Sequence, residues 1–162
     1  MGEREDRTMR DRKLLLGVLP GVLFGVNVVA RLINRFALDG EQAAVDRLSF
    51  AMFGVLALIL AVVSFVIGQR RPLGQWSPYV GAAILIAMAA TVLIGPFVSG
   101  GGPFADGVDA FFVQIAFYLG FTGLGAVLGY LVLITLGKDY RSESLRRLAE
   151  TKLNKPRRVV RR

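Results

Sequence analysis

The chain has 162 residues, of which 54% are hydrophobic, and its formal net charge of +8 arises from 20 Lys and Arg against 12 Asp and Glu. This length allows one domain, and the grouping of the apolar residues in long blocks excludes an ordinary soluble surface. Because the sequence contains no Cys and no His, disulfides, thiolate chemistry, zinc sites and His-ligated haem are excluded.

The N-terminal part combines a charged segment with the first apolar run. Residues 1–13 alternate basic and acidic side chains, and we expect a cytoplasmic N-terminal tail there. The apolar run that follows predicts a membrane span at about 14–34, in which the long side chain of Arg31 reaches toward the interface. A basic segment followed by an apolar run that ends at 28–30 is also typical of a cleaved signal peptide. Pro20 weakens that alternative, which stays open.

Two further uncharged runs predict the second and third spans, at about 48–68 and 79–99. The loop 69–78 between them should be cytoplasmic, with Trp76 placed where aromatic side chains gather at the membrane interface. Pro96, which follows a glycine near the end of the third span, should loosen or kink the last turn.

The fourth span is predicted at about 111–136 and carries no charge. A helix of this length would measure about 40 Å at 1.5 Å per residue, which exceeds the hydrocarbon core of a membrane. The helix should therefore tilt, or project into the cytoplasm toward the C-terminal tail.

The tail 138–162 holds ten of the twenty basic residues of the chain against three acidic ones. A weak apolar stripe predicts a short amphipathic helix that ends before Pro156; its members are Leu145, Leu148, Ala149 and Leu153. Anionic lipid head groups or a cytoplasmic partner are the expected ligands of eight basic side chains, Arg146, Arg147, Lys152, Lys155, Arg157, Arg158, Arg161 and Arg162. No nucleic acid is expected as a partner, because the tail contains a single aromatic residue and no recognisable binding module.

The distribution of charge predicts the orientation of the chain. With four spans, the two tails and the loop 69–78 hold 17 Lys and Arg, and the other two connections hold 3. The positive-inside rule then places both termini in the cytoplasm of a multi-pass inner-membrane protein. The signal-peptide alternative leaves three spans and the same side for the C-terminus.

Glycines at a spacing of four residues mark faces on which helices can approach closely, because lipid does not drive helices together by hydrophobicity. The helix-packing candidates are Gly17, Gly21 and Gly25 on the first helix and Gly125 and Gly129 on the fourth. We expect these two faces to pack mostly within the monomer, with the pairing of one against the other as the structural hypothesis; a partner-facing surface is the alternative. Milder versions on the second and third helices are Ala57 with Ala61 and Ala83 with Ala87.

Polar residues are few within the apolar runs. Asn27 and Gln114 fall in the outer halves of their helices, where they can hydrogen-bond between helices or line a small polar pocket. Apart from Arg31 at the outer end of the first helix, the predicted spans contain no Asp, Glu, Lys, Arg or His. Most ion-coupled and proton-coupled pathways need such groups.

The fold expected is therefore an all-α integral membrane protein, a four-transmembrane-helix bundle with short connections and a basic cytoplasmic tail. We expect a non-enzymatic accessory, assembly or scaffolding subunit of a larger membrane protein complex, with no catalytic residue, metal or cofactor. A small oligomeric transporter or channel is the alternative, and a homo-oligomer stays open. A lipid-modifying enzyme is a third possibility. Its site could use only the five acidic residues in the two non-cytoplasmic connections, here called the outer acids: Asp39, Glu41, Asp46, Asp106 and Asp109.

Overall fold

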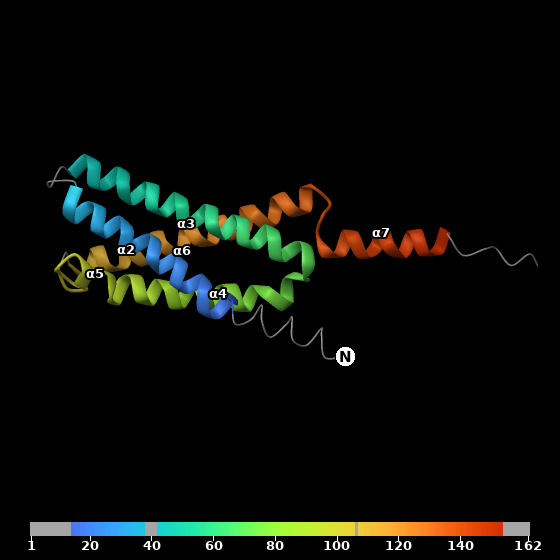
Figure 1. Ribbon diagram of the computed structural model, residues 1–162, viewed down its shortest axis with the longest axis horizontal. Helices are drawn as coiled ribbons and strands as arrows, with labels where there is room; N and C mark the ends of the chain where they lie inside the picture. The colour runs from blue at the N-terminus through green and yellow to red at the C-terminus, as the bar shows by residue number, and fades with distance from the viewer. Residues whose placement is uncertain (1–13, 38–41, 106, 154–162) are drawn as a thin grey trace, which may run out of the picture.

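The computed structural model describes residues 14–37, 42–105 and 107–153, and all the regular structure in these ranges is helical. Four of the helices are long and apolar enough to cross a membrane. They lie side by side along the long axis of the molecule (Figure 1): α2 Leu19–Ala37, α3 Gln42–Arg70, α4 Leu73–Leu93 and α6 Val108–Thr135. The shorter elements are the π-helix η1 Leu14–Val18 and the helices α5 Gly95–Val98 and α7 Tyr140–Leu153.

The first long helix passes Pro20 without a break. Proline has no N–H to donate, so it costs least in the first turn of a helix. Pro20 is buried as the second residue of α2, and the wider π turn of η1 directly precedes α2. A local π turn is a common way to absorb a change in helical register. The apolar helical path therefore runs continuously from Leu15 to Phe36.

The connection between α3 and α4 is shorter than the predicted loop 69–78. Only Arg71 and Pro72 separate the two helices, because Pro72 (φ −64°, ψ 146°) is extended and begins a new helix at once. Trp76 consequently lies within α4, only 4% exposed, with its ring centroid 6.1 Å from that of Tyr130 on α6. The sequence-based placement of Trp76 in an interfacial loop is corrected accordingly.

The predicted break near Pro96 is confirmed, and it is more complete than a loosened turn. α4 ends at Leu93, and the four-residue α5 follows with Pro96 in its first turn. The N–H of Gly101 donates to the carbonyl oxygen of Pro96 at 3.0 Å and folds the chain back toward α6. The third apolar helix therefore covers 73–93 instead of the expected 79–99.

The fourth long helix ends in a hydrogen-bonded glycine cap. Gly137 has φ +62°, its N–H donates to the carbonyl of Ile134 at 2.9 Å, and the N–H of Lys138 donates to that of Leu133 at 3.2 Å. These two bonds form a Schellman motif, which stops a helix by reversing its last turn. α6 thus ends at this cap, and the chain continues as the separate helix α7, which projects away from the bundle (Figure 1).

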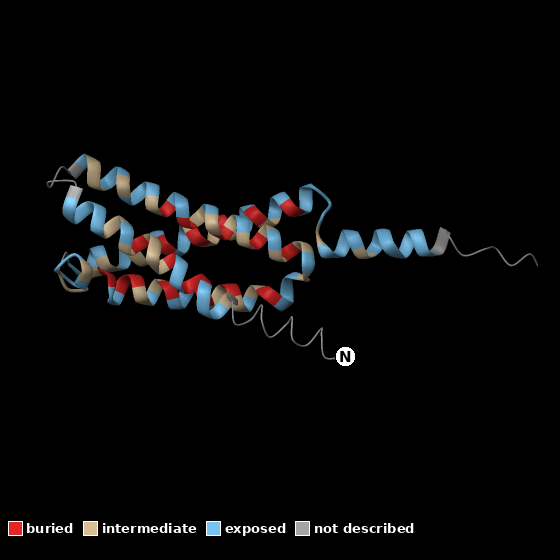
Figure 2. Ribbon diagram, in the orientation of Figure 1, coloured by how far each residue is buried: buried red, intermediate tan, exposed pale blue. Residues whose placement is uncertain are grey.

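Burial follows the bundle geometry. Figure 2 shows buried residues where the long helices face one another, whereas nearly all the described residues of α7 are exposed. The core consists of Leu19, Leu23, Phe53, Leu56, Leu60, Trp76, Val80, Ala83, Ile84, Ala87 and Tyr118. The outward faces carry large exposed apolar side chains such as Leu58 (64%) and Phe112 (62%). Such faces suit a lipid environment, so the helices are those of a multi-pass membrane protein.

Candidate functional site

The closest helix contact joins α3 and α6 through Gly125 and Gly129. A Cβ atom built on either glycine would overlap the main chain of α3, lying 2.6 Å from the Cα of Ala57 or of Ala61 and still closer to the carbonyl oxygen of the same alanine. Two glycines and two alanines, each pair four residues apart, thus face each other and let the backbones touch. Gly125 and Gly129 of α6 are therefore packed against α3 within the monomer.

The glycine face of the first helix is not that partner. No heavy atom of the described residues outside its own turn of helix lies within 4 Å of a Cβ built on Gly17, Gly21 or Gly25. The expected pairing between this face and Gly125 with Gly129 is therefore replaced by the contact of α6 with α3. The reason is that α2 turns its opposite face, with buried Leu23 and Asn27, toward the bundle.

A polar cluster lies where α2 ends, at the end of the bundle opposite α7 (Figure 1). Asn27 is only 2% exposed; its amide nitrogen donates to the sulfur of Met52 at 3.2 Å, and its oxygen accepts from Nε of Arg31 at 2.9 Å. Arg31 also donates through Nη1 to the hydroxyl of Ser99 at 3.3 Å. A Cβ on Gly95 would lie 2.8 Å from Arg31 Nε, so the absence of a side chain there makes room for the guanidinium. These bonds tie α2 to α3 and to the segment after α5.

A cavity of about 480 Å³, here called the polar cavity, opens beside this cluster. Its apolar lining residues include Met52, Phe53 and Phe117. Its polar wall comes from three helices: Asn27, Arg31 and Asn34 of α2, Asp46 and Ser49 of α3, and Gln114 of α6. The two amides that sequence placed in the outer halves of their helices, Asn27 and Gln114, thus line one cavity. Its volume is in the range of small-ligand sites.

An apolar groove of about 470 Å³, here called the α6 groove, adjoins the polar cavity. It is lined by Val113, Ala116, Phe117, Gly120, Phe121 and Leu124, and two of these, Val113 and Phe117, also line the polar cavity. The ring of Phe53 stacks on that of Phe121 with centroids 5.4 Å apart and on that of Phe117 at 6.0 Å. These stacked rings fix the wall that the two hollows share.

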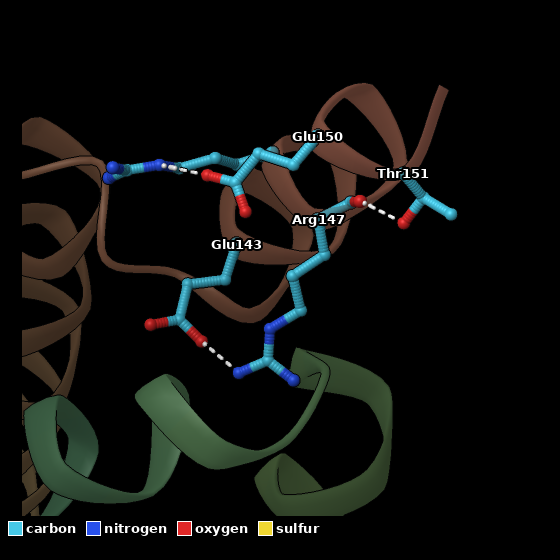
Figure 3. Close-up of polar contacts among 5 residues, drawn as sticks. Glu143, Arg147, Glu150 and Thr151 are labelled. Atoms are coloured by element: carbon cyan, nitrogen blue, oxygen red, sulfur yellow. Dashed lines mark hydrogen bonds and ion pairs between the residues drawn. The ribbon is translucent and has the colours of Figure 1, made fainter. Parts of the chain in front are cut away.

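The described part of the tail is a solvent-exposed helix held by charge pairs within it. Arg146 Nε lies 3.2 Å from a carboxylate oxygen of Glu150, and Arg147 Nη2 lies 3.3 Å from one of Glu143, as Figure 3 shows. The backbone N–H of Ser142 donates to the carboxylate of Asp139 at 3.3 Å and so caps the helix start. Leu145 (62%) and Leu148 (58%) of the expected apolar stripe are exposed.

Several of the basic residues predicted to contact lipid or a partner have side chains that lie outside the described residues. Lys152 falls on α7, but its side chain lies outside the described residues. The N-terminal tail 1–13 and the remaining basic residues of the C-terminal tail also lie outside them: Lys155, Arg157, Arg158, Arg161 and Arg162.

Among the described residues, no group of three or more His, Cys, Asp or Glu is arranged to hold a metal ion. Of the five outer acids that a lipid-modifying enzyme would need, Asp46 lines the polar cavity and Asp109 lies in the first turn of α6, whereas the other three lie outside the described residues. No protein-family model, curated protein or solved structure matches the chain.

Sequence reasoning missed the role of Arg31. Its position at the end of an apolar run indicated only a side chain that reaches the interface. The available signal was Asn27, four residues earlier on the same helix face, since residues at that spacing are neighbours. The part that Gly95 and Ser99 play carries no local signal, because it depends on how the chain returns after α4.

Proposed function

We propose that this protein is a non-enzymatic accessory, assembly or scaffolding subunit of a larger membrane protein complex. The observation that carries the proposal is the open glycine face of η1 and α2, where a Cβ on Gly17, Gly21 or Gly25 meets no heavy atom of the described residues outside its own turn of helix. Within a membrane, smooth faces of this kind are where helices of different chains approach closely. The glycine pair on α6 is already covered by α3, which leaves the α2 face for a partner.

Flanking side chains favour the same interpretation. Val18 (54% exposed) and Val22 (46%) lie on the same side of Gly21 on the helix surface and form an exposed apolar ridge beside it. A single helix of a partner subunit, with small residues of its own, can lie on the glycine face against such a ridge. The proposed contact is thus helix to helix and lies in the half of α2 nearest to α7.

The proposed orientation has both termini and the short α3–α4 connection in the cytoplasm. Its support is the charge distribution, with 17 of the 20 Lys and Arg on that side. In this orientation α7 stands on the cytoplasmic side of an inner membrane, where it can hold anionic lipid or a cytoplasmic partner at about 1 kcal/mol per basic residue near the surface.

Affinity purification from native membranes in mild detergent, followed by native mass spectrometry, tests the proposal. An accessory subunit should appear in a complex of fixed stoichiometry with other membrane proteins, and Gly21→Leu should release it. The matched control is Gly54→Leu on α3, which also meets open space but lies off the glycine face. A species made only of copies of this chain would contradict the proposal and favour the small oligomeric transporter or channel.

A further inference from the structure

We infer that the polar cavity and the α6 groove together bind one phospholipid molecule whose head group carries both a phosphate and a primary amine. The two hollows share Val113 and Phe117, so the polar cavity lies next to the apolar α6 groove. That sequence of surfaces matches a molecule with a charged head and an apolar chain. The inference does not depend on a partner subunit.

The head-group chemistry follows from the charged residues of the cavity wall. Among the described residues that line the cavity, Arg31 supplies the only cation and Asp46 the only anion. Hydrogen bonds to Asn27 and Ser99 fix the Arg31 guanidinium at the wall, where its charge attracts a phosphate. A carboxylate accepts hydrogen bonds, so Asp46 suits an ammonium group that carries N–H donors.

The chain of the lipid would lie along the α6 groove. From Val113 to Leu124 the groove follows α6 for about 16 Å at 1.5 Å per residue, about half of a ~30 Å hydrocarbon core. This is the depth of one leaflet. The groove begins beside the polar cavity, at the end of the bundle where α6 starts, and runs toward its middle. The lipid would therefore belong to the leaflet opposite α7, with its head at the surface.

Selectivity must come from the head group. Every membrane lipid offers acyl chains, so burying a chain in the groove exchanges one apolar neighbour for another. Arg31 alone would accept any phospholipid phosphate. Discrimination between amine, choline and glycerol head groups rests on Asp46, because the choline nitrogen has no N–H and the glycerol head group has no positive charge.

Native mass spectrometry of the purified chain with three phospholipids of identical acyl chains tests the inference. We expect retention of the ethanolamine lipid to exceed that of the choline and glycerol lipids by about tenfold, the effect of one hydrogen bond to a charged group. Asp46→Asn should bring the three lipids to similar retention. Gly120→Leu should lower retention of all of them by filling the groove. Gly123→Leu is its control, since a Cβ there also meets open space and the residue does not line the groove.

Several results would overturn the inference. The role of Asp46 is contradicted if the unaltered chain retains the three lipids equally, or retains the choline or glycerol lipid more strongly. It is also contradicted if the Asp46→Asn variant keeps the preference for the ethanolamine lipid. Equal lipid retention by Gly120→Leu and Gly123→Leu would show that the lipid chain does not lie in the α6 groove. The head-group comparison uses the unaltered chain, so it decides the matter even when a variant fails to fold.

Discussion

Gly129 of α6 lies directly on the main chain of Ala61 of α3, so close that a Cβ at position 129 would sit 2.6 Å from the Cα of Ala61. Gly125 makes the same approach to Ala57 one turn earlier. This seam holds α3 and α6 together through the middle and the α7 end of the bundle. It also removes Gly125 and Gly129 from the surface, whereas the face formed by Gly17, Gly21 and Gly25 is still open to a partner.

Substitution at the seam should therefore destabilise the monomer, whereas substitution on the open face should not. Gly129→Leu forces the α6 and α3 backbones apart, at a cost of about 1–3 kcal/mol or more. We expect its thermal unfolding midpoint in detergent to fall by about 5 °C. Gly21→Leu should leave the midpoint unchanged or slightly higher, because leucine favours a helix more than glycine does. Equal loss of stability in both variants would contradict the close contact of Gly129 with Ala61.

Asn27 should contribute to stability through its bonds to other helices. In Asn27→Leu, Arg31 loses the acceptor 2.9 Å away and Met52 loses its donor, which should cost about 1–2 kcal/mol. Thr135→Val is the matched control, since Thr135 is exposed and bonds only to carbonyls of its own helix. The measurement is the fall in the unfolding midpoint of each variant. If the midpoint falls no further in Asn27→Leu than in Thr135→Val, the hydrogen bonds of Asn27 do not stabilise the bundle.

The junction of α6 and α7 should depend on the left-handed conformation of Gly137. With φ at +62°, alanine at this position is disfavoured by about 1–2 kcal/mol. Hydrogen exchange should then show the amide of Lys138, which bonds to Leu133, losing about tenfold in protection. Gly74→Ala lies within α4 with open space around its Cβ and should leave this protection unaltered. Unchanged exchange of Lys138 in Gly137→Ala would contradict the cap.

The acids of α7 should limit its attraction to anionic lipid. Glu143 and Glu150 pair with Arg147 and Arg146, and changing both acids to Gln adds two units of positive charge at about 1 kcal/mol each near an anionic surface. Amide exchange of α7 should slow in nanodiscs that contain anionic lipid, slow further in the double variant, and recover in high salt, which screens exposed charges. Identical exchange in neutral and anionic nanodiscs would mean that α7 does not contact the membrane surface.

Much of the fold follows from the sequence, because long apolar runs separated by charged connections form few structures other than membrane-spanning helices. Two details, the position of Trp76 and the partner of Gly125 and Gly129, could not be predicted, for physical reasons. Trp76 follows Arg71 and Pro72, which look like the start of a loop, yet a proline with extended ψ also begins a helix. The partner of Gly125 and Gly129 was misassigned because a spacing of four residues defines a smooth face without naming its neighbour.

The candidate sites were only partly predictable for a related reason. Asn27 and Gln114 stand out as polar residues in apolar runs, and both line the polar cavity. The contribution of Asp46 depends on how the start of α3 lies beside α2 and α6. No periodicity or motif encodes that placement, which arises from the packing of three helices.

Cysteine cross-linking in native membranes tests the central claim most directly, because the chain contains no cysteine of its own. A cysteine at Gly21 should cross-link to a cysteine in a transmembrane helix of a different protein, and a cysteine at Gly54 should not. The adduct should have the mass of this chain plus one partner of fixed identity. Cross-linking of Gly21→Cys only to a second copy of this chain, or no adduct beyond that of Gly54→Cys, would contradict the account.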